Sequence, residues 1–147
     1  MSIVQPILTG ARVLDLYAGS GALGLEALSR GAAQADFVDV SLAAIKVIRE
    51  NGTDLGALEQ MRIHRGEALR FAQKLDAGAY DVAFADPPYN LGMAPRLATW
   101  WLRVPFADVI GIEHDVHEAL PEGGQMRTYG DTAVTIYRVE NRGEGET

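Results

Sequence analysis

Residues 85–90 carry a group of atoms that could bind a planar amine. They read Ala85-Asp86-Pro87-Pro88-Tyr89-Asn90 and follow an apolar run of strand type at 80–84. Because proline has no N–H and a fixed φ angle, the backbone after Asp86 presents carbonyl acceptors in a preset geometry. A carboxylate, a rigid carbonyl and an aromatic face suit the exocyclic NH2 of a nucleobase. We therefore expect Asp86, Pro87 and Tyr89 to be catalytic residues; the alternative is that Asp86 only caps the turn.

A second candidate site is the glycine-rich loop at 17–24, which follows an apolar run at 11–16. Its G-x-G-x-x-G pattern, with Asp39 twenty residues after Gly19, also fits the dinucleotide fingerprint. Asp15 argues against a dinucleotide, because its charge would face the place that a pyrophosphate needs. S-adenosylmethionine carries an α-ammonium and a sulfonium, which a carboxylate favours, and Asp39 can accept from its ribose. We favour the methyl donor; Asp15 as a turn former and Asp39 as a strand-end acid remain alternatives.

The surrounding pattern predicts alternating strands and helices. We expect strands at 11–16, 35–40, 61–64, 80–84 and 108–113, and then a hairpin of 126–129 with 133–139 across Gly130-Asp131. We expect a helix from Leu23 to a stop at Gly31, and one from about Leu42 to Asn51 with Ser41 as cap and Gly52 as end. We expect two more at about 67–75 and ending near Arg103, the last with Pro95 in its first turn. This alternation implies an α/β fold: a parallel sheet with right-handed crossovers, closed by an antiparallel pair.

Composition limits the class of protein. A chain of 147 residues with 48% hydrophobic residues is long enough for one domain, which we place at 11–140 between a lead at 1–10 and a frayed polar tail at 141–147. No apolar run reaches the roughly 18 residues of a membrane span, and no cysteine is present. We expect a cytoplasmic protein without a membrane partner. The net charge of −7 counts against a protein that grips nucleic acid unaided.

Four stretches together resemble the bacterial 16S rRNA guanine-N2 methyltransferases. These are residues 14–32, Phe37-Val38-Asp39, residues 65–69, and the motif from Asp86 to Tyr89. That family belongs to the Rossmann-like class I methyltransferases with an (Asp/Asn)-Pro-Pro-(Tyr/Phe) motif. The similarity runs from about Leu8 to Val139, and it is specific in the first ninety residues. Relative to the family, the chain has only ten residues before its first strand, Glu67 in place of aspartate, and Asp39 in place of glutamate.

The resemblance implies S-adenosyl-L-methionine as cofactor and a three-layer sandwich with a mostly parallel, seven-stranded sheet that ends in an antiparallel hairpin. It implies as substrate a guanine in 16S rRNA or in the small ribosomal subunit, as an assembly intermediate. We expect a monomer. The expected cofactor-binding residues are Asp15, Tyr17, Ala18, Gly19, Ser20, Gly21, Asp39, Val40, Glu67, Ala68 and Asp86.

Other interpretations stay open. The motif at Asp86 also serves adenine-N6 and protein-amide methyltransferases. The short lead and the acidic charge favour a third interpretation, a cofactor-binding domain that needs a partner for activity. Glu67 could be only a first-turn residue that complements a helix dipole. We expect Trp100 and Trp101 to pack in the core, and no metal site, since His114 and His117 lack a third firm ligand.

Overall fold

One mixed sheet forms the middle layer of the molecule. The computed structural model describes residues 8–142, and within them seven strands lie in the order β3-β2-β1-β4-β5-β7-β6. Strands β3, β2, β1, β4 and β5 run parallel, while β7 is antiparallel to both β5 and β6. The strand bounds are β1 Arg12–Leu16, β2 Gln34–Asp39, β3 Met61–Arg65, β4 Tyr80–Ala85, β5 Ala107–Asp115, β6 Gln125–Tyr129 and β7 Thr132–Arg138.

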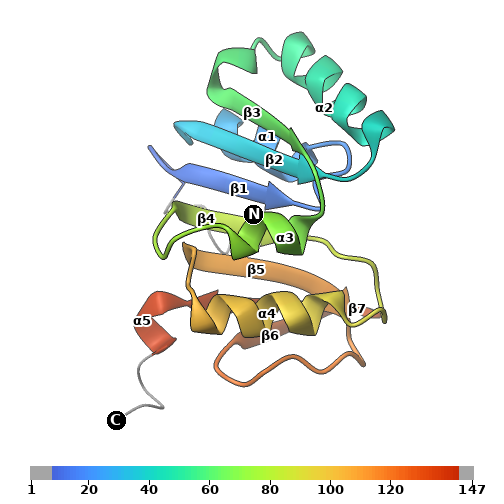
Figure 1. Ribbon diagram of the computed structural model, residues 1–147, viewed down its shortest axis with the longest axis vertical. Helices are drawn as coiled ribbons and strands as arrows, with labels where there is room; N and C mark the ends of the chain where they lie inside the picture. Colours follow the sequence, from blue (N-terminus) through green and yellow to red (C-terminus); the bar gives the residue numbers. More distant parts are fainter. Residues whose placement is uncertain (1–7, 143–147) are drawn as a thin grey trace.

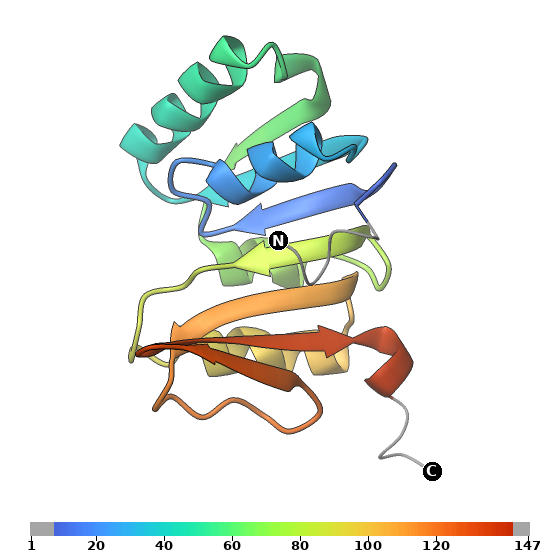
Figure 2. The same cartoon turned by 180° about the vertical axis from the view of Figure 1, so that it is seen from behind.

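Helices cover both faces of the sheet. Helices α3 (Ala68–Gln73) and α4 (Met93–Arg103) lie on the face seen in Figure 1. Helices α1 (Ala22–Ser29) and α2 (Leu42–Asp54) lie on the opposite face, which Figure 2 shows. A 3₁₀ turn at Leu58–Gln60 precedes β3, and the short helix α5 (Val139–Arg142) follows β7. The three-layer α/β sandwich with a mostly parallel sheet and a closing hairpin is as predicted.

Each face of the sheet has its own hydrophobic core. On the α3 and α4 side, Leu97, Trp101 and Ile110 are among the fully buried side chains. On the α1 and α2 side, Phe37 and Ile48 have no exposed surface. The central strands contribute to both cores, which explains why they are continuously apolar in sequence rather than alternating. None of the helices among the described residues is long and apolar enough to cross a bilayer.

Two predicted helix boundaries are wrong. Helix α2 does not end at Gly52 but continues to Asp54, although Ser41 caps its start as expected by accepting from the Ala44 N–H. Gly52 is buried inside the helix and packs against Met61, since a Cβ there would lie 2.5 Å from Met61 Sδ. This glycine therefore allows close packing and does not end the helix. Helix α3 covers Ala68–Gln73, shorter than 67–75, and Glu67 is its N-cap.

The ends of the chain bear on two further predictions. Asn141 and Arg142 complete α5, and the rest of the tail predicted to be frayed lies outside the described residues. Most of the predicted lead, residues 1–7, lies outside them too.

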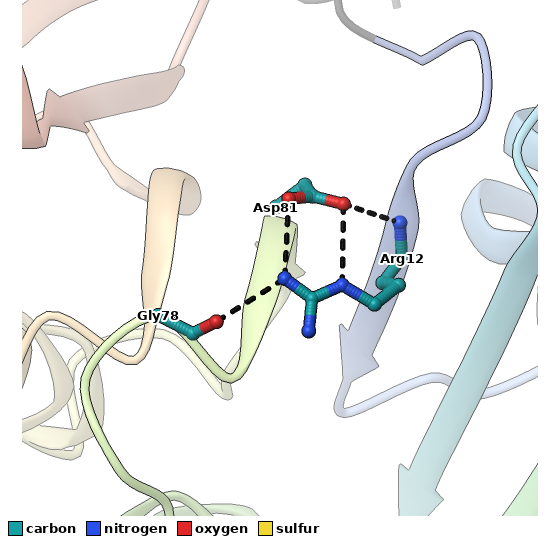
Figure 3. A network of polar contacts seen from close by, with 3 residues as sticks. All are labelled: Arg12, Gly78 and Asp81. Carbon is teal, nitrogen blue, oxygen red and sulfur yellow. Dashed lines mark hydrogen bonds and ion pairs between the residues drawn. The ribbon is translucent and has the colours of Figure 1, made fainter.

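An arginine clamp holds the two central strands together at the edge where they begin. Arg12 of β1 donates to Asp81 of β4 from its backbone N–H at 2.8 Å and from its guanidinium at 3.3 and 3.4 Å (Figure 3). The guanidinium also donates to the Gly78 carbonyl at 3.2 Å. Partial burial raises the pKa of Asp81, but the hydrogen bonds and charge of Arg12 outweigh it, so the pKa lies below its ordinary value. The clamp fixes β1 beside β4 at the edge opposite the one where the parallel strands end.

Gly24 of α1 generates a test of how α1 meets the sheet. A Cβ at Gly24 would lie 2.3 Å from the ring of Phe37, which is fully buried. Overpacking of this kind costs roughly 1–3 kcal/mol, against about 1 kcal/mol gained in helix propensity. We expect Gly24→Ala to lower the free energy of unfolding by up to about 2 kcal/mol in urea titrations.

Gly52→Ala is the matched control, because it adds the same methyl to a helix but meets the flexible end of Met61. We expect its effect to be within about 1 kcal/mol of zero. Equal losses in the two variants would contradict a rigid contact between Gly24 and Phe37.

Candidate active site

Three aspartates meet at the edge of the sheet where the parallel strands end. Asp15 belongs to β1, Asp39 ends β2, and Asp86 directly follows β4. In the sheet, β1 lies between β2 and β4, and the chain reverses its direction of winding between β1 and β4. Ligands of open α/β sheets bind at such a switch point, beyond the carboxyl ends of the strands. The Asp86 N–H donates to the Leu16 carbonyl at 3.4 Å, which extends the pairing of β1 with β4 into the site.

The glycine loop is shaped by left-handed backbone conformations and anchored to β2. Tyr17, Gly19 and Gly21 have φ angles of 57°, 59° and 80°. The Gly19 N–H donates to Asp39 Oδ2 at 2.9 Å, and the Ala18 N–H donates to the Val38 carbonyl at 3.0 Å. A tyrosine in this conformation is strained, which is typical of positions that the surrounding structure holds for a function.

Asp15 lies beneath the loop. It is 2% exposed, and its Oδ2 accepts from the N–H of Gly24 in the first turn of α1 at 3.0 Å. Burial raises the pKa of Asp15 from 3.8 to about 7; the Gly24 hydrogen bond opposes this, while the charges of Asp86 and Asp39 add to it. Its Oδ1 has no hydrogen bond to any described residue. The cluster of acids therefore favours a positively charged ligand.

The start of α1 can hold a negatively charged group. Its N-cap is Gly21, which has no side chain, and among the described residues the only side chain that accepts from the first turn is Asp15, at the Gly24 N–H. The N–H groups of Ala22 and Leu23 are consequently available to a ligand carboxylate, which the helix dipole also favours. A carboxylate site thus lies beside a cation site, the arrangement that an α-amino acid requires.

The orphaned hydroxyl of Tyr17 tests whether S-adenosylmethionine fits. This hydroxyl is buried and has no hydrogen-bond partner among the described residues. Burial raises its pKa to about 12, the charge of Glu67 adds to this, and that of Arg96 opposes it. An unpaired buried hydroxyl is rare and indicates a missing partner such as a ligand or water. The carboxylate and cation sites fit the methionine part of the cofactor, and the unpaired hydroxyl lies on the α3 and α4 side of the loop.

The expected ribose and adenine residues lie at the ends of β2 and β3. Asp39 accepts from the Gly19 and Ser41 N–H groups at 2.9 Å each and retains lone pairs for ribose hydroxyls. The side chain of Val40 is 57% exposed beside it, which leaves an apolar surface for adenine. Glu67 uses both of its carboxylate oxygens on the Leu69 and Arg70 N–H groups of α3.

This N-cap role agrees with the alternative interpretation of Glu67 as a residue that stabilises a helix start. A contact of Glu67 or of the buried Ala68 with adenine stays a prediction.

The Asp-Pro-Pro-Tyr-Asn segment is held from its far end. The Tyr89 hydroxyl donates to Glu113 Oε2 and lies 3.1 Å from Thr132 Oγ1. Asn90, with a φ of 60°, donates from Nδ2 to Asp115 at 2.7 Å. The segment is therefore fixed against β5 and the start of β7, and the ring of Tyr89 is tethered through its hydroxyl.

Glu113 is a site residue that sequence reasoning missed. Burial, a hydrogen bond with Glu113 and the negative charge of Glu113 together raise the pKa of Asp86 from 3.8 to about 7. In the sequence, Glu113 is only the last residue of the predicted strand at 108–113. The signal that could have found it is its place near the carboxyl end of the strand next to β4, where neighbouring acids meet.

The remaining candidates are structural. Trp101 is fully buried and donates from Nε1 to the Ala107 carbonyl, and half-buried Trp100 donates to the Ala72 carbonyl. His114 is 1% exposed and is bonded through its ring to Thr135 and to the Asp115 carbonyl. Within residues 8–142 no group of three or more histidines and acids could hold a metal.

The raised pKa of Asp15 predicts a pH dependence of stability. The folded protein keeps a proton that the unfolded chain releases above pH 3.8, so stability declines as the pH rises to about 7. Asp15→Asn keeps an acceptor for Gly24 and removes the charge. We expect the variant to match the wild type near pH 4 and to exceed it above pH 7 by on the order of 2–4 kcal/mol in urea unfolding.

The same variant should bind S-adenosylmethionine more weakly in calorimetry, because it lacks the negative charge that attracts the cation. A variant that binds equally well would show that Asp15 serves only the fold.

Comparisons with known proteins agree with this geometry. A family model described as conserved hypothetical protein 95 matches residues 1–138. The chain is 35% identical to "Putative rRNA methyltransferase YlbH" of Bacillus subtilis, over 93% of this chain and 80% of that protein. It is 32% identical to "Ribosomal RNA small subunit methyltransferase D" of Escherichia coli strain K12, over 97% and 76%.

A solved structure described as "Putative methyltransferase yhhF from Escherichia coli" superposes with a TM-score of 0.80 at 28% identity, over 93% of this chain and 80% of that one. The site and the matches lead to one conclusion: the chain belongs to the family described as conserved hypothetical protein 95 and is an S-adenosylmethionine-dependent class I methyltransferase of the small-subunit methyltransferase D type.

Proposed function

We propose that this enzyme methylates the exocyclic N2 amine of a guanine in 16S rRNA, on the small ribosomal subunit or an assembly intermediate of it. The observation that carries the proposal is the fixed Asp-Pro-Pro-Tyr segment beside the acid cluster. Its tether to Glu113, Thr132 and Asp115 holds acceptors and an aromatic ring next to the cofactor loop. The two relatives named above are described as rRNA methyltransferases, which supports RNA as the substrate class. We further propose that it acts as a monomer in the cytoplasm.

The residues of the glycine loop and of the start of α1 would hold the cofactor. Asp15 would hold its ammonium, the N–H groups of Ala22 and Leu23 its carboxylate, and Asp39 its ribose. S-adenosylmethionine supplies an electrophilic methyl group on a positively charged sulfur. The acids around that sulfur stabilise the cation.

Asp86 and Pro87 position the amine. The guanine amine is a poor nucleophile because its lone pair is delocalised into the ring. The Asp86 carboxylate and the Pro87 carbonyl, which accepts no hydrogen bond within residues 8–142, can take the two N–H bonds of the amine. This holds the nitrogen so that its lone pair is less delocalised into the ring and points at the methyl group. Orientation of this kind is worth up to about 7–11 kcal/mol in favourable cases.

Tyr89 holds the base itself. Its hydroxyl is tethered, so its ring can stack on a base with a gain of roughly 1–3 kcal/mol. The guanine must leave its helical stack to reach this pocket. As the N–C bond forms, the bond between the methyl group and sulfur breaks and leaves a neutral thioether. Positive charge thereby passes to the nitrogen, and the nearby Asp86 carboxylate stabilises it. The methylated amine then loses its proton to Asp86 or to water.

Methyl transfer from tritiated S-adenosylmethionine tests this function. The substrates are small ribosomal subunits, free 16S rRNA and DNA, and the labelled product is identified after nucleoside and amino acid analysis. We expect N2-methylguanosine, and a rate lower by roughly 10²–10⁴-fold in Asp86→Asn. Asp76→Asn is the matched control, because it makes the same change at an exposed loop carboxylate before β4.

Other products would identify the alternatives. N6-methyladenosine or a methylated protein amide would overturn the guanine assignment but keep the chemistry. Cofactor binding without any transfer would favour a domain that needs a partner.

The raised pKa of Asp86 predicts the pH profile. Only the carboxylate form of Asp86 both accepts a hydrogen bond from the amine and stabilises the positive charge that develops on it. The rate should therefore fall as the pH drops through about 7. Glu113→Gln removes a charge and an acidic hydrogen-bond partner that raise this pKa. We expect the acid limb to move to lower pH in the variant, in single-turnover assays from about pH 5 to about pH 9. An unchanged limb would mean that another group controls it.

A further inference from the structure

A groove between α3 and α4 has no assigned role. It has a volume of about 310 Å³ and lies on the face seen in Figure 1. Helix α3 contributes Leu69 and Gln73 to it, and α4 contributes Arg96, Thr99, Trp100 and Arg103. We call it the α3–α4 groove. Both helices start at the edge of the sheet that carries the acid cluster, since each follows the carboxyl end of a parallel strand.

The groove is positively charged in a negatively charged protein. Of the residues that the structure describes, two with guanidinium groups line it and none with an acidic side chain does. The chain as a whole carries a net charge of −7. Arg12 and Arg30 are paired with Asp81 and Glu26, whereas neither arginine of the groove forms an ion pair with any of the described residues. An uncompensated pair of arginines therefore faces solvent.

Trp100 lines the groove, and a hydrogen bond holds its side chain in place. Its indole N–H donates to the Ala72 carbonyl of α3 at 3.1 Å, so it joins the two helices. The guanidinium of Arg103 lies over its ring, 5.9 Å from the centroid. Arg96 and Arg103 are seven residues apart on one face of α4, about 10 Å along the helix axis. The two charges are thus presented in a row.

The row begins next to the cofactor loop. Arg96 lies in the first turn of α4, which follows the Asp86 segment after Gly92. Met93, in the same helical turn, and Tyr17 of the loop both pack against the core on this face of the sheet. An RNA strand with one base in the site could therefore continue along α4.

We propose that the α3–α4 groove binds the phosphate backbone of the RNA strand beside the target base, with Arg96 and Arg103 each on a phosphate; this rests on the proposed RNA substrate. Guanidinium groups bind phosphate through paired, charge-assisted hydrogen bonds. RNA affinity depends mainly on phosphate contacts, and a net charge of −7 disfavours them elsewhere. A strand with an unstacked base needs support on its flanks, and this groove lies where a flank would pass.

The salt dependence of RNA binding tests the groove. The double variant Arg96→Gln/Arg103→Gln removes two charges without adding bulk. Its matched control, Arg49→Gln/Arg62→Gln, removes two exposed arginines from α2 and β3. Affinity for fluorescein-labelled 16S rRNA is measured by anisotropy at increasing salt, with S-adenosylhomocysteine present.

We expect the groove variant to bind roughly tenfold or more weakly at low salt. We also expect its plot of log affinity against log salt to lose a slope of about 0.7–0.9 per phosphate contact, and the control slope to change much less. Cofactor affinity by calorimetry should be unchanged in both, which excludes general misfolding.

The outcomes separate the two proposals. Equal slopes for the groove and control variants, with an active wild type, would overturn the groove and leave the RNA methyltransferase standing. A wild type that neither binds nor methylates rRNA but methylates a ribosomal protein would overturn both.

Discussion

A buried carboxyl under the glycine loop is the interaction on which the site depends. Asp15 joins the end of β1 to the start of α1 through the Gly24 N–H, in a place with almost no solvent. A hydrogen bond in such surroundings is strong, but the charge on the carboxyl is costly there. Asp39 and Asp86 add their own charges from the neighbouring strands. A cationic ligand offsets the repulsion among these negative charges, which favours S-adenosylmethionine over neutral or anionic ligands.

The second half of the site depends on the antiparallel end of the sheet. The two prolines stiffen the segment after β4, but its position is set by Tyr89 and Asn90, which bind groups of β5 and β7. Glu113 therefore has two effects: it tethers the tyrosine and it raises the pKa of Asp86. The hairpin of β6 and β7 completes a sheet edge and also supplies part of the wall that keeps the segment in place.

Charge is divided between two regions that lie side by side. The acid cluster suits the methyl donor but would repel RNA, since phosphates gain affinity mainly from cations. The α3–α4 groove carries the opposite sign, and both of its helices start at the same edge of the sheet as the acid cluster. An overall charge of −7 is therefore compatible with an RNA substrate, because a local row of arginines can meet the strand while the acids hold the cofactor.

The sequence alone determined the order of strands and helices, the closing hairpin and the two motifs, because apolar periodicity, glycine turns and prolines act over a few residues. It placed Asp15, Asp39 and Asp86 at strand ends, and the sheet order then brought them together. Tertiary structure decided what depends on distant neighbours. Gly52 reads as a helix stop until Met61 is seen against it, and Glu113 reads as an ordinary strand acid until Tyr89, 24 residues away, is seen bonded to it. Burial and contacts of this kind determine the pKa values and the shape of the groove, and neither can be predicted from a local sequence pattern.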